Sequence, residues 1–548
     1  MNLLNLIILI VYLFILTLLG FVGFKQTKTS QDYLLAGRKT HPLIMALSYG
    51  ATFISTSAIV GFGGLAANMG MGLLWLTFLN VFIGVFIAFV FFGKRTRRIG
   101  HTLDAHTFPE LIGKRFNSKF IQGYAALLIF ICMPIYSAAV IKGGANFIQT
   151  YFGMSYYAAL LFFVAIVAIY VWMGGMKGVM YTDAFQGAIM FFAMIVLLFV
   201  AYGKLGGVAS AHAQLTALFG QSDVQSAMAK SIQTGFQGWT SMPKAGSSMW
   251  WSMISTIVMG VGIGALAQPQ MIVRFMTVKS NKELNRGVLS GGIFILAMAG
   301  IAYVVGALSN VLLYQSTGSI SIVAAGGVSD NIIPLFIKTY LPDWFSSIFL
   351  ICMLAAAMST ISSQFHTMGT AAGRDLYEKT LGKTGNTMMI TRVGILIVIV
   401  MSTAIAWFSN GLPIAEGIIA KFTSIFFELT TAAFLPMYIG ALYFRKMPRA
   451  AAKASMIAGS VSWFIWTFFI HSNASYFQIC NLVFGKTSLV LNTSLQSWSM
   501  VGTTMIALPV SILAMAIVWI IYAAKKKSDL DPSYIEGCFA GIGEKKAE

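Results

Sequence analysis

The sequence predicts an all-α integral membrane protein with about thirteen transmembrane helices. Three observations predict this fold class: a composition that is 57% hydrophobic and only 10% charged, long apolar stretches between short polar loops, and basic residues gathered in alternate loops. Soluble domains carry about 25% charged residues. The mean hydropathy of +0.79 therefore leaves little of the chain for a soluble domain.

Each apolar stretch is long enough to cross ~30 Å of hydrocarbon, which takes about 20 helical residues. The first stretch has no basic segment before it and no small-residue cleavage site, and Lys25 and Lys28 follow it. We therefore interpret it as a retained helix and not as a signal peptide. In chain order, the predicted spans lie near residues 3–24, 43–67, 71–93, 120–149, 156–174, 184–203, 251–275, 287–314, 344–371, 388–408, 413–444, 454–471 and 500–523.

The basic residues predict the orientation of these spans. When the spans are threaded in order, 29 of the 36 lysines and arginines fall on one side of the membrane and 5 on the other, with Lys142 and Lys421 inside spans. Basic loops stay in the cytoplasm. The N-terminus is therefore predicted outside and the C-terminus in the cytoplasm of a multi-pass cell (inner) membrane protein. The net charge of +19 reports this orientation, so no nucleic-acid partner is expected.

The spans also show a weak internal repeat. The second span carries Gly50 and hydroxyl residues at mid-depth, and five spans later the seventh carries Gly260, Gly262, Gly264 and Pro269. An odd offset makes the two halves enter the membrane from opposite sides. Paired interrupted helices in an inverted repeat point to the binding site of a secondary transporter. The alternative is that these glycines only allow close helix packing.

The repeat defines the predicted domain organisation. A polytopic transporter domain covers about residues 1–527 and contains a 5+5 inverted repeat, and a polar cytoplasmic tail follows over 528–548. Repeat one covers spans 2–6, about 43–203, and repeat two covers spans 7–11, about 251–444. One extra helix precedes the repeats, and two extra helices follow them.

The stretch SYGATFISTS, from Ser48 to Ser57, places six hydroxyl side chains, counting the tyrosine, and a glycine within a membrane span. Unwound backbone at membrane depth is tolerated only where it is buried in protein or lines a cavity. Unwinding releases carbonyl oxygens from the helical ladder, and carbonyls and hydroxyls are hard, neutral ligands for a small cation such as Na⁺. The stretch therefore predicts an interrupted helix at a cation site.

The ninth span offers the facing ligands in the string LAAAMSTISSQ, from Leu354 to Gln364. Ser359 and Thr360 lie three and four residues after Ala356 and therefore share its helical face. Ser362 and Ser363 continue the polar stripe by another turn. The alternative is that these hydroxyls only bond back to the carbonyls of their own helix. Together with the interrupted second span, the stripe favours a binding site.

Four strings identify a family resemblance over nearly the whole chain. They are GATFISTSAIVGFGG (50–64), WMGGMKGVMYTDAFQG (172–187), AQPQMIVRFM (267–276) and AAAMSTISSQ with the following RDLYEK (374–379). In this order and spacing the chain resembles the sodium:solute symporter family. The resemblance implies the inverted-repeat fold of the bacterial leucine transporter and Na⁺ as the coupling ion.

The resemblance also implies sodium ligands. The first site would use backbone carbonyls of the interrupted helix together with a carbonyl and two hydroxyls of the ninth span. Some members, such as sialic acid transporters, bind a second sodium. Its ligands are further serines of the ninth span and an aspartate on the helix after the GG-x-K-x-V turn. By position, the first set is Ala51, Ile54, Ala356, Ser359 and Thr360, and the second is Asp183, Ser362 and Ser363.

Several polar residues are candidates for substrate contact. Ser55, Thr56, Ser57 and Gln268 lie beside the two helix interruptions, and Thr77 and Asn80 face the same region in sugar-carrying relatives. Lys142 could attract a substrate carboxylate or could snorkel outward. Asp183 could cap a helix, and Arg274 could pair with it as an inner gate or serve as an ordinary cytoplasmic anchor.

The substrate expectation rests on one departure from the proline branch of the family. That branch has an aspartate where this chain has Phe53, and pantothenate-like members have an aromatic residue there. We therefore expect uptake of a small carboxylate, either a monocarboxylate or a pantothenate-like acid. The alternative is a Na⁺/proline or other amino-acid symporter. Coupling to protons in place of sodium also stays open.

Functions of other classes are disfavoured. A membrane-embedded enzyme would need a motif such as HExxH or a nucleophile–base pair at membrane depth, and the six histidines form no such motif. An ion channel would need a continuous pore, which an inverted repeat does not predict. The expected partners are a small solute, Na⁺ and the lipid bilayer, with no obligate protein partner.

Overall fold

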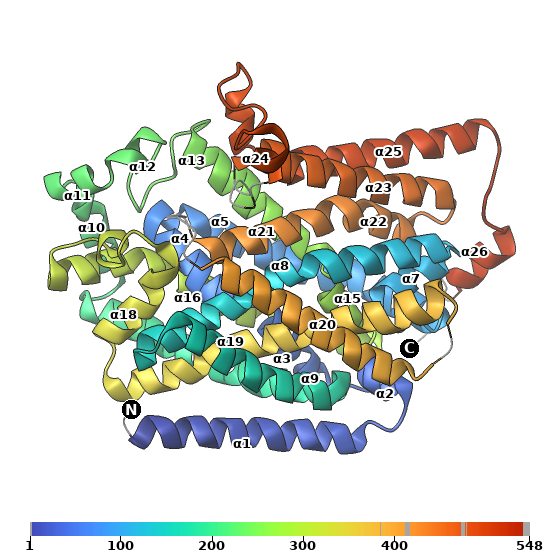
Figure 1. Ribbon diagram of the computed structural model, residues 1–548, viewed down its shortest axis with the longest axis horizontal. Coiled ribbons are helices and arrows are strands. Elements are labelled where there is room, and N and C mark those ends of the chain that lie inside the picture. The colour runs from blue at the N-terminus through green and yellow to red at the C-terminus, as the bar shows by residue number, and fades with distance from the viewer. Residues whose placement is uncertain (1–2, 384, 411–416, 473–476, 478, 541–548) are drawn as a thin grey trace.

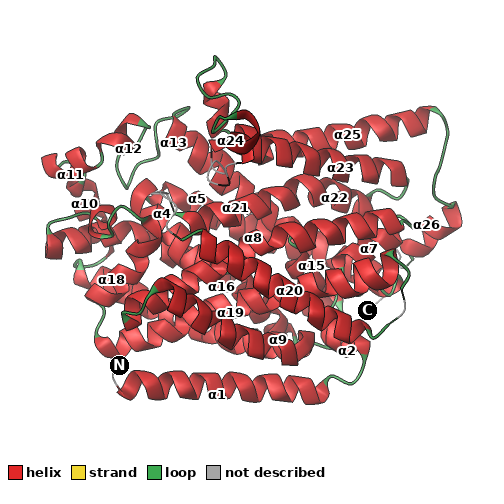
Figure 2. Ribbon diagram, viewed as in Figure 1, coloured by secondary structure: helices red, strands yellow, loops and turns green. Residues whose placement is uncertain are grey.

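The computed structural model describes residues 3–383, 385–410, 417–472, 477 and 479–540, and all regular structure within these residues is helical (Figures 1 and 2). Long helices run roughly parallel across the molecule. In Figure 1 they lie horizontally, with α1 (Leu3–Gln26) along the lower edge and α25 (Thr504–Ala524) along the upper edge. The all-α membrane fold predicted from the sequence is therefore confirmed.

Eleven helices in the described part are long and apolar enough to cross a membrane, and a bent pair of shorter helices gives a twelfth span. The fifth predicted span, 156–174, corresponds to the shorter apolar helix Tyr156–Ala168, which falls below the length counted for a full span. Besides α1 and α25, the spans contain α8 (Lys119–Phe152), α9 (Tyr156–Lys204), η5 (Ser252–Val261), α16 (Asn281–Thr317), α19 (Asp343–Thr370), α20 (Thr387–Phe408) and α23 (Arg449–Ile465). Two further spans combine consecutive helices. One contains α5 (Leu74–Val81), η4 (Phe82–Gly93) and α6 (Lys94–Thr102), and the other contains α21 (Ile418–Leu429), η9 (Thr430–Phe434) and α22 (Leu435–Tyr443).

Two predicted spans, 156–174 and 184–203, join within α9. A kink at Gly175 separates the two helical segments, with φ of +55° and ψ of −178°. A Cβ at this position would lie 2.8 Å from the ring of Tyr33. The left-handed backbone and the close ring together explain why glycine stands here.

The second span is interrupted, as predicted. The helix α3 (Pro42–Phe53) ends where Ile54 takes an extended conformation, with φ of −92° and ψ of 100°. The chain resumes as η2 (Ser57–Gly61) and α4 (Phe62–Met69), bent by 49° from α3. A smooth helix through Ile54 is thus excluded.

The seventh span is interrupted as well. The short helix η6 (Ala265–Ala267) ends at Gln268, which is extended with φ of −70° and ψ of 116°. The next helix, α15 (Pro269–Phe275), begins with proline at its first position, where a missing N–H costs nothing. The paired interruptions agree with an inverted repeat. Its limits near 43–203 and 251–444 stay predictions, and residues 413–416 of the predicted span 413–444 lie outside the described residues.

Burial separates central helices from peripheral ones. In the span containing α19, 94% of the residues of the most apolar window are buried, and the span of α21 and α22 reaches the same value. The corresponding values are 28% for α1 and 22% for α25. Because α3 packs against α9, α16 and α19, its interruption lies in the protein interior, where unwound backbone is tolerated.

Short helices lie at the two ends of the long ones (Figure 1). At one end are α10 (Val208–Leu218), α11 (Ser222–Ala227), α12 (Ala229–Gln233) and α18 (Ile332–Tyr340). At the other end are α2 (Ser30–Leu35), α7 (Phe108–Arg115) and α26 (Pro532–Cys538). The helix α26 belongs to the predicted polar tail, and the guanidinium of Arg115 stacks over the ring of Phe539 at 4.7 Å.

Candidate functional site

The interrupted end of α3 meets the middle of α19 in the protein interior. The Ser359 hydroxyl donates a hydrogen bond of 2.8 Å to the Ala51 carbonyl and lies 3.4 Å from the Ala356 carbonyl. The Thr360 hydroxyl donates to the Thr52 carbonyl at 3.1 Å. All of these residues are buried. The structure thus brings together Ala51, Ala356, Ser359 and Thr360, four of the five residues predicted for the first sodium.

The local sequence explains why carbonyl oxygens are available here. A helix leaves its last four carbonyls without partners in its own ladder. Because α3 ends at Phe53, the Gly50 carbonyl accepts from the Ile54 N–H at 2.9 Å. The next two carbonyls, of Ala51 and Thr52, accept from hydroxyls of α19. Ile54, the fifth predicted ligand, is the residue at which the backbone leaves the helix. Neutral oxygens gathered in this way fit a small hard cation.

Asp183 of α9 forms a second polar cluster, on the cytoplasmic side of the first in the predicted orientation. Its Oδ2 accepts hydrogen bonds from Ser48 at 3.0 Å and from Thr52 and Ser363 at 3.3 Å. Its Oδ1 accepts from Ser362 at 3.4 Å. The three residues predicted for a second sodium therefore do lie together.

Arg274 occupies the centre of this second cluster. Its Nη2 lies 2.8 Å from Asp183 Oδ2 and 2.6 Å from the Ser363 hydroxyl, and it donates to the Thr52 hydroxyl at 2.5 Å. The side chains of Arg274 and Asp183 are both fully buried. Interpreting Arg274 as an ordinary cytoplasmic anchor is therefore wrong, because its guanidinium lies inside the protein and pairs with Asp183.

Ser48 and Thr52 are the members of this cluster that the sequence analysis did not assign. They belong to the stretch SYGATFISTS and stand four residues apart, so they lie on one face of α3. The Ser48 hydroxyl accepts from Arg274 Nε at 3.0 Å. The i, i+4 spacing of two hydroxyls was the signal that could have identified them.

The predicted substrate contacts separate into two groups. Thr56 and Gln268 have hydrogen-bond partners: Thr56 donates to the Val140 carbonyl at 3.0 Å, and Gln268 Nε2 donates to the Thr430 hydroxyl at 2.8 Å. Among the described residues, no protein partner reaches the buried polar atoms Ser57 Oγ, Thr77 Oγ1 and Asn80 Oδ1. Such atoms cost about 1–3 kcal/mol each when they stay unsatisfied, so they need a ligand or water.

Near the break of α3, the predicted contact Ser55 shares its surroundings with Gln364, which was not predicted to bind substrate. Ser55 lies next to the Tyr136 side chain, which also adjoins Gln364. Gln364 Oε1 accepts a hydrogen bond of 2.6 Å from Ser137. Its Nε2 is buried and, within the part of the chain that the structure describes, has no hydrogen-bond partner. Ser55, at the break after α3, and Gln364 of α19 thus line the same region, next to Tyr136 of α8.

Lys142 is buried, with 6% of its surface exposed, and does not snorkel into solvent. Its Nζ lies 3.4 Å from Asn410 Oδ1 and 4.8 Å from the centre of the Tyr156 ring, and it interacts electrostatically with Asp330. Asp330 Oδ2 in turn accepts from the N–H of Ile418 at 3.0 Å. Lys142 is therefore directed toward the start of α21.

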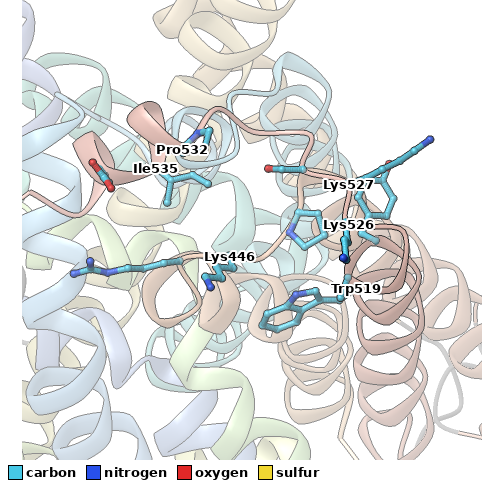
Figure 3. Close-up of a pocket in the computed structure, with 12 residues that line it drawn as sticks. Lys446, Trp519, Lys526, Lys527, Pro532 and Ile535 are labelled. Atoms are coloured by element: carbon cyan, nitrogen blue, oxygen red, sulfur yellow. The ribbon is translucent and has the colours of Figure 1, made fainter.

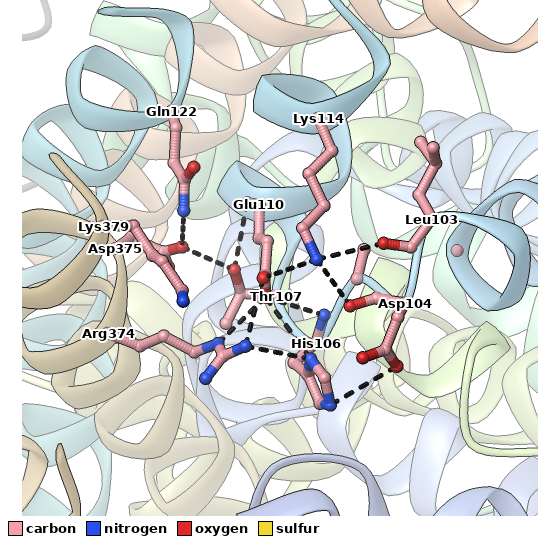
Figure 4. Close-up of polar contacts among 12 residues, drawn as sticks. Leu103, Asp104, His106, Thr107, Glu110, Lys114, Gln122, Arg374, Asp375 and Lys379 are labelled. Carbon is pink, nitrogen blue, oxygen red and sulfur yellow. Dashed lines mark hydrogen bonds and ion pairs between the residues drawn. The ribbon is translucent and has the colours of Figure 1, made fainter. Parts of the chain in front are cut away.

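Figure 4 shows a separate polar network that ties α7 to the chain after α19. Glu110 of α7 pairs with Arg374 Nε at 2.9 Å and with Lys114 Nζ at 3.0 Å. Asp375 Oδ1 accepts from Thr107 and Gln122, both at 2.8 Å. Both acidic residues are fully buried. The network links the RDLYEK string to the loop region between the spans of α6 and α8.

Glu110 is held ionised by this network. Burial raises the pKa of its carboxyl, but hydrogen bonds from His106 and Arg374 and the charges of Arg374 and Lys114 outweigh burial and hold that pKa well below its usual range. A carboxyl with a depressed folded-state pKa stabilises the fold above its unfolded pKa, and this contribution is lost as pH falls through the folded value. It is therefore constant from pH 5 to 8.

Replacing Glu110 with glutamine is expected to destabilise the protein by about 3 kcal/mol, because it removes the buried carboxylate that pairs with Arg374 and leaves only Glu378, at 4.0 Å, on the more exposed side. Thermal unfolding of the purified protein at pH 7 measures this loss. Glu378→Gln is the control, since Glu378 lies on the partly exposed side of Arg374 and should cost less than about 1 kcal/mol. Equal losses in the two variants would contradict the assignment.

Comparison with known proteins gives a consistent result. A model of the sodium:solute symporter family matches residues 33–459. The sodium/proline symporter 2 of Staphylococcus saprophyticus is 28% identical over 483 residues, covering 85% of each chain. A sodium/proline symporter of Staphylococcus aureus is 29% identical over 476 residues, covering 83% of this chain and 84% of the relative.

Two solved structures share the fold. A Na⁺-coupled sialic acid symporter in a substrate-bound outward-open state has a TM-score of 0.71 at 17% identity, over 96% of this chain and 98% of the other. MHP1, a nucleobase-cation-symport-1 family transporter in a closed conformation, has a TM-score of 0.54 at 13% identity, over 93% and 99%. With the family match over most of its length, the chain belongs to the sodium:solute symporter family.

Proposed function

We propose that this protein is a Na⁺-coupled symporter that takes up a small zwitterionic amino acid, with proline as the first candidate. The observation that carries the sodium part is the 2.8 Å contact between the Ser359 hydroxyl and the Ala51 carbonyl at the end of an interrupted helix. The substrate part rests on the relatives, which are named sodium/proline symporters. They favour the amino-acid alternative over the monocarboxylate or pantothenate-like acid.

The position of Phe53 removes the main argument against an amino acid. Phe53 is buried, and its ring lies 6.4 Å from that of Tyr49 in a stacked arrangement. A Cβ on Gly84 of η4 would lie 3.1 Å from the Phe53 ring. Phe53 therefore packs between α3 and η4, and its aromatic character does not indicate the kind of solute that binds.

The first sodium would bind the carbonyls of Ala51, Ile54 and Ala356 and the hydroxyls of Ser359 and Thr360. These ligands come from α3 and α19, so an ion bound there favours the arrangement in which the two helices are in contact. The solute would bind near the break of α3, against Ser55, Ser57 and Gln364. Because the solute and the ion would both depend on the conformation of α3 at its break, each favours the other's binding by the same factor.

Uptake would draw on the sodium gradient and the membrane potential. Moving one charge through 100 mV is worth ~2.3 kcal/mol. We assign one sodium to the transport cycle, because the Arg274 guanidinium already neutralises Asp183 at 2.8 Å. A second sodium at Asp183, Ser362 and Ser363 would require this guanidinium to withdraw.

We further assign the protein to the cell (inner) membrane, with the N-terminus outside and the C-terminus in the cytoplasm. The distribution of basic residues supports this orientation. The family and fold are those of transporters, which favours a symporter over an enzyme or a channel. A channel would pass ions without a fixed ratio to solute.

Uptake by the purified protein in liposomes tests this function. Labelled proline, acetate, lactate and pantothenate are offered under a Na⁺ gradient, under a proton gradient and without any gradient. Proline should accumulate at least about tenfold over its level without Na⁺, and the other solutes should not; ~2.3 kcal/mol per 100 mV allows this ratio. Accumulation driven by protons alone would contradict the sodium assignment, and accumulation of only a carboxylic acid would contradict the substrate.

A further inference from the structure

A pocket of about 540 Å³ lies where the end of α25 meets α26 and the loop before α23. In Figure 3, Lys446 and Trp519 lie on one side of it and Pro532 and Ile535 on the other, with Lys526 and Lys527 at the edge. It lies far along the chain from the sodium and solute residues. Its lining residues are Arg445, Lys446, Pro448, Trp519, Tyr522, Ala523, Lys526, Lys527, Ser528, Pro532, Ile535 and Glu536.

The pocket is strongly basic. Four of its lining residues are cations and one, Glu536, is an anion, so the lining has a net charge of 4 − 1 = +3. Lys446, Lys526 and Lys527 are exposed to solvent. The guanidinium of Arg445 lies 5.4 Å from the centre of the Phe539 ring, which fixes one basic side chain against the tail. Such a lining favours an anionic ligand.

The backbone at the end of α25 turns back over the last turn of that helix. The helix ends at Ala524, and Lys526 takes a left-handed conformation with φ of +50°. The chain then turns back, and the Lys527 N–H donates to the Tyr522 carbonyl at 3.0 Å. Lys526 and Lys527 therefore follow directly on the last turn of α25, and they line the pocket together with Trp519 and Tyr522.

The pocket also lies at the end of a lipid-facing surface. On α25, four apolar side chains are 43–67% exposed: Leu513, Ile517, Ile520 and Ile521. Trp519 stands between Ile517 and Ile520 in the chain and lines the pocket, where its ring packs against Phe444 at 5.2 Å. Tryptophan is typical of the headgroup level of a membrane. An exposed apolar stripe next to a tryptophan and a basic pocket offers apolar contact for the acyl chains of a phospholipid and positive charge for its phosphate.

We infer that this pocket binds an anionic glycerophospholipid of the cytoplasmic leaflet. The phosphate group lies among Lys446, Lys526 and Lys527, and the acyl chains extend along the exposed face of α25. Basic pockets at the cytoplasmic ends of transmembrane helices recognise such headgroups. Since the lining comes from α25, α26 and the loop before α23, the bound lipid joins the tail to the membrane domain and stabilises both.

Thermal unfolding and native mass spectrometry of the delipidated full-length protein test this inference. Dioleoyl phosphatidylglycerol should raise the unfolding midpoint and stay bound, whereas dioleoyl phosphatidylcholine, with the same acyl chains, should do neither. Glycerol phosphate at the same concentration separates a lipid site from a site for a soluble anion. Equal effects of the two lipids, or a full effect of glycerol phosphate, would overturn the inference.

The decisive variant is Lys446→Gln/Lys526→Gln/Lys527→Gln. It should bind phosphatidylglycerol at least about tenfold more weakly, since each basic residue contributes to attraction at a membrane surface. Lys28→Gln/Lys39→Gln/Lys282→Gln is the matched control, because it removes three exposed lysines outside the pocket. The control should bind like the unaltered protein.

The single variant Lys446→Gln applies the same test if the triple variant does not fold, and its binding should be weaker in the same direction. Unchanged lipid binding in a folded pocket variant, or equal weakening in the control, would overturn the inference. Na⁺-driven uptake is measured in parallel, so a failure of the proposed transport function is distinguished from a failure of lipid binding.

Discussion

Ser359→Ala and Thr360→Ala are each expected to raise the sodium concentration for half-maximal uptake by about tenfold, and the double variant by more. A hydrogen bond or ligand contact to a charged group is worth about 1.5–3 kcal/mol, and 1.4 kcal/mol corresponds to a factor of ten. Both hydroxyls are buried and directed at carbonyls of α3. Alanine removes a hydroxyl ligand of the sodium ion, and water cannot easily replace it because the site is buried.

The measurement is initial uptake of labelled solute against sodium concentration in proteoliposomes. Thr370→Ala is the matched control, since Thr370 is a buried residue of the same helix whose hydroxyl bonds to its own helix, at the Thr367 carbonyl. This control should keep the sodium dependence of the unaltered protein. Solute affinity at saturating sodium should recover in Ser359→Ala, because the coupling between the two ligands is reciprocal. If both site variants kept normal sodium dependence, the assigned ligands would be wrong.

Arg274→Gln is expected to lower the free energy of unfolding by about 3–5 kcal/mol, the loss typical of removing one partner of a buried ion pair. The Asp183 carboxylate would then stay buried beside neutral hydroxyls only. Asp183→Asn should cost a similar amount, because it leaves the guanidinium uncompensated. The double variant should lose much less than the sum of the two, since no charge is left unpaired.

A double-mutant cycle of thermal unfolding in detergent measures this coupling. Additive losses would show that the 2.8 Å pair contributes no coupling energy. Repeating the cycle at several sodium concentrations tests the stoichiometry. If sodium stabilised Arg274→Gln more than the unaltered protein, the vacated position would be a sodium site. Equal sodium dependence of the two would support a single sodium site between α3 and α19.

The interruptions and the polar stripe were predictable because their causes are local. Glycine and hydroxyls around Gly50, and Pro269 after Gln268, weaken a helix through residues that are neighbours in the chain. The i, i+3, i+4 relation of Ala356, Ser359 and Thr360 follows from helical geometry alone. The structure places breaks at Ile54 and Gln268 and brings the stripe to the first of them.

The sequence left the role of Arg274 open, because the residues that contact its side chain are distant in the chain. Its contacts come from residues 89 to 226 positions away: Ser363, Asp183 and Ser48. A basic residue that follows a membrane span looks like a cytoplasmic anchor in the sequence. Only the packing of α15 against α3 and α19 makes it an interior residue. Whether Lys142 points inward or snorkels outward was left open for the same reason, since its direction depends on the distant residues Asn410 and Asp330.

The sequence by itself determined that this chain spans a membrane many times, where its helices break, and which hydroxyls share a helical face. These properties depend on hydropathy and on backbone preferences within a few residues. The tertiary structure alone decided which polar groups meet, that a guanidinium stands among the residues considered for a second sodium, and that Phe53 packs against another helix. Buried polar groups in a membrane must find partners on other helices, and the rotation and position of those helices are set by packing between distant segments.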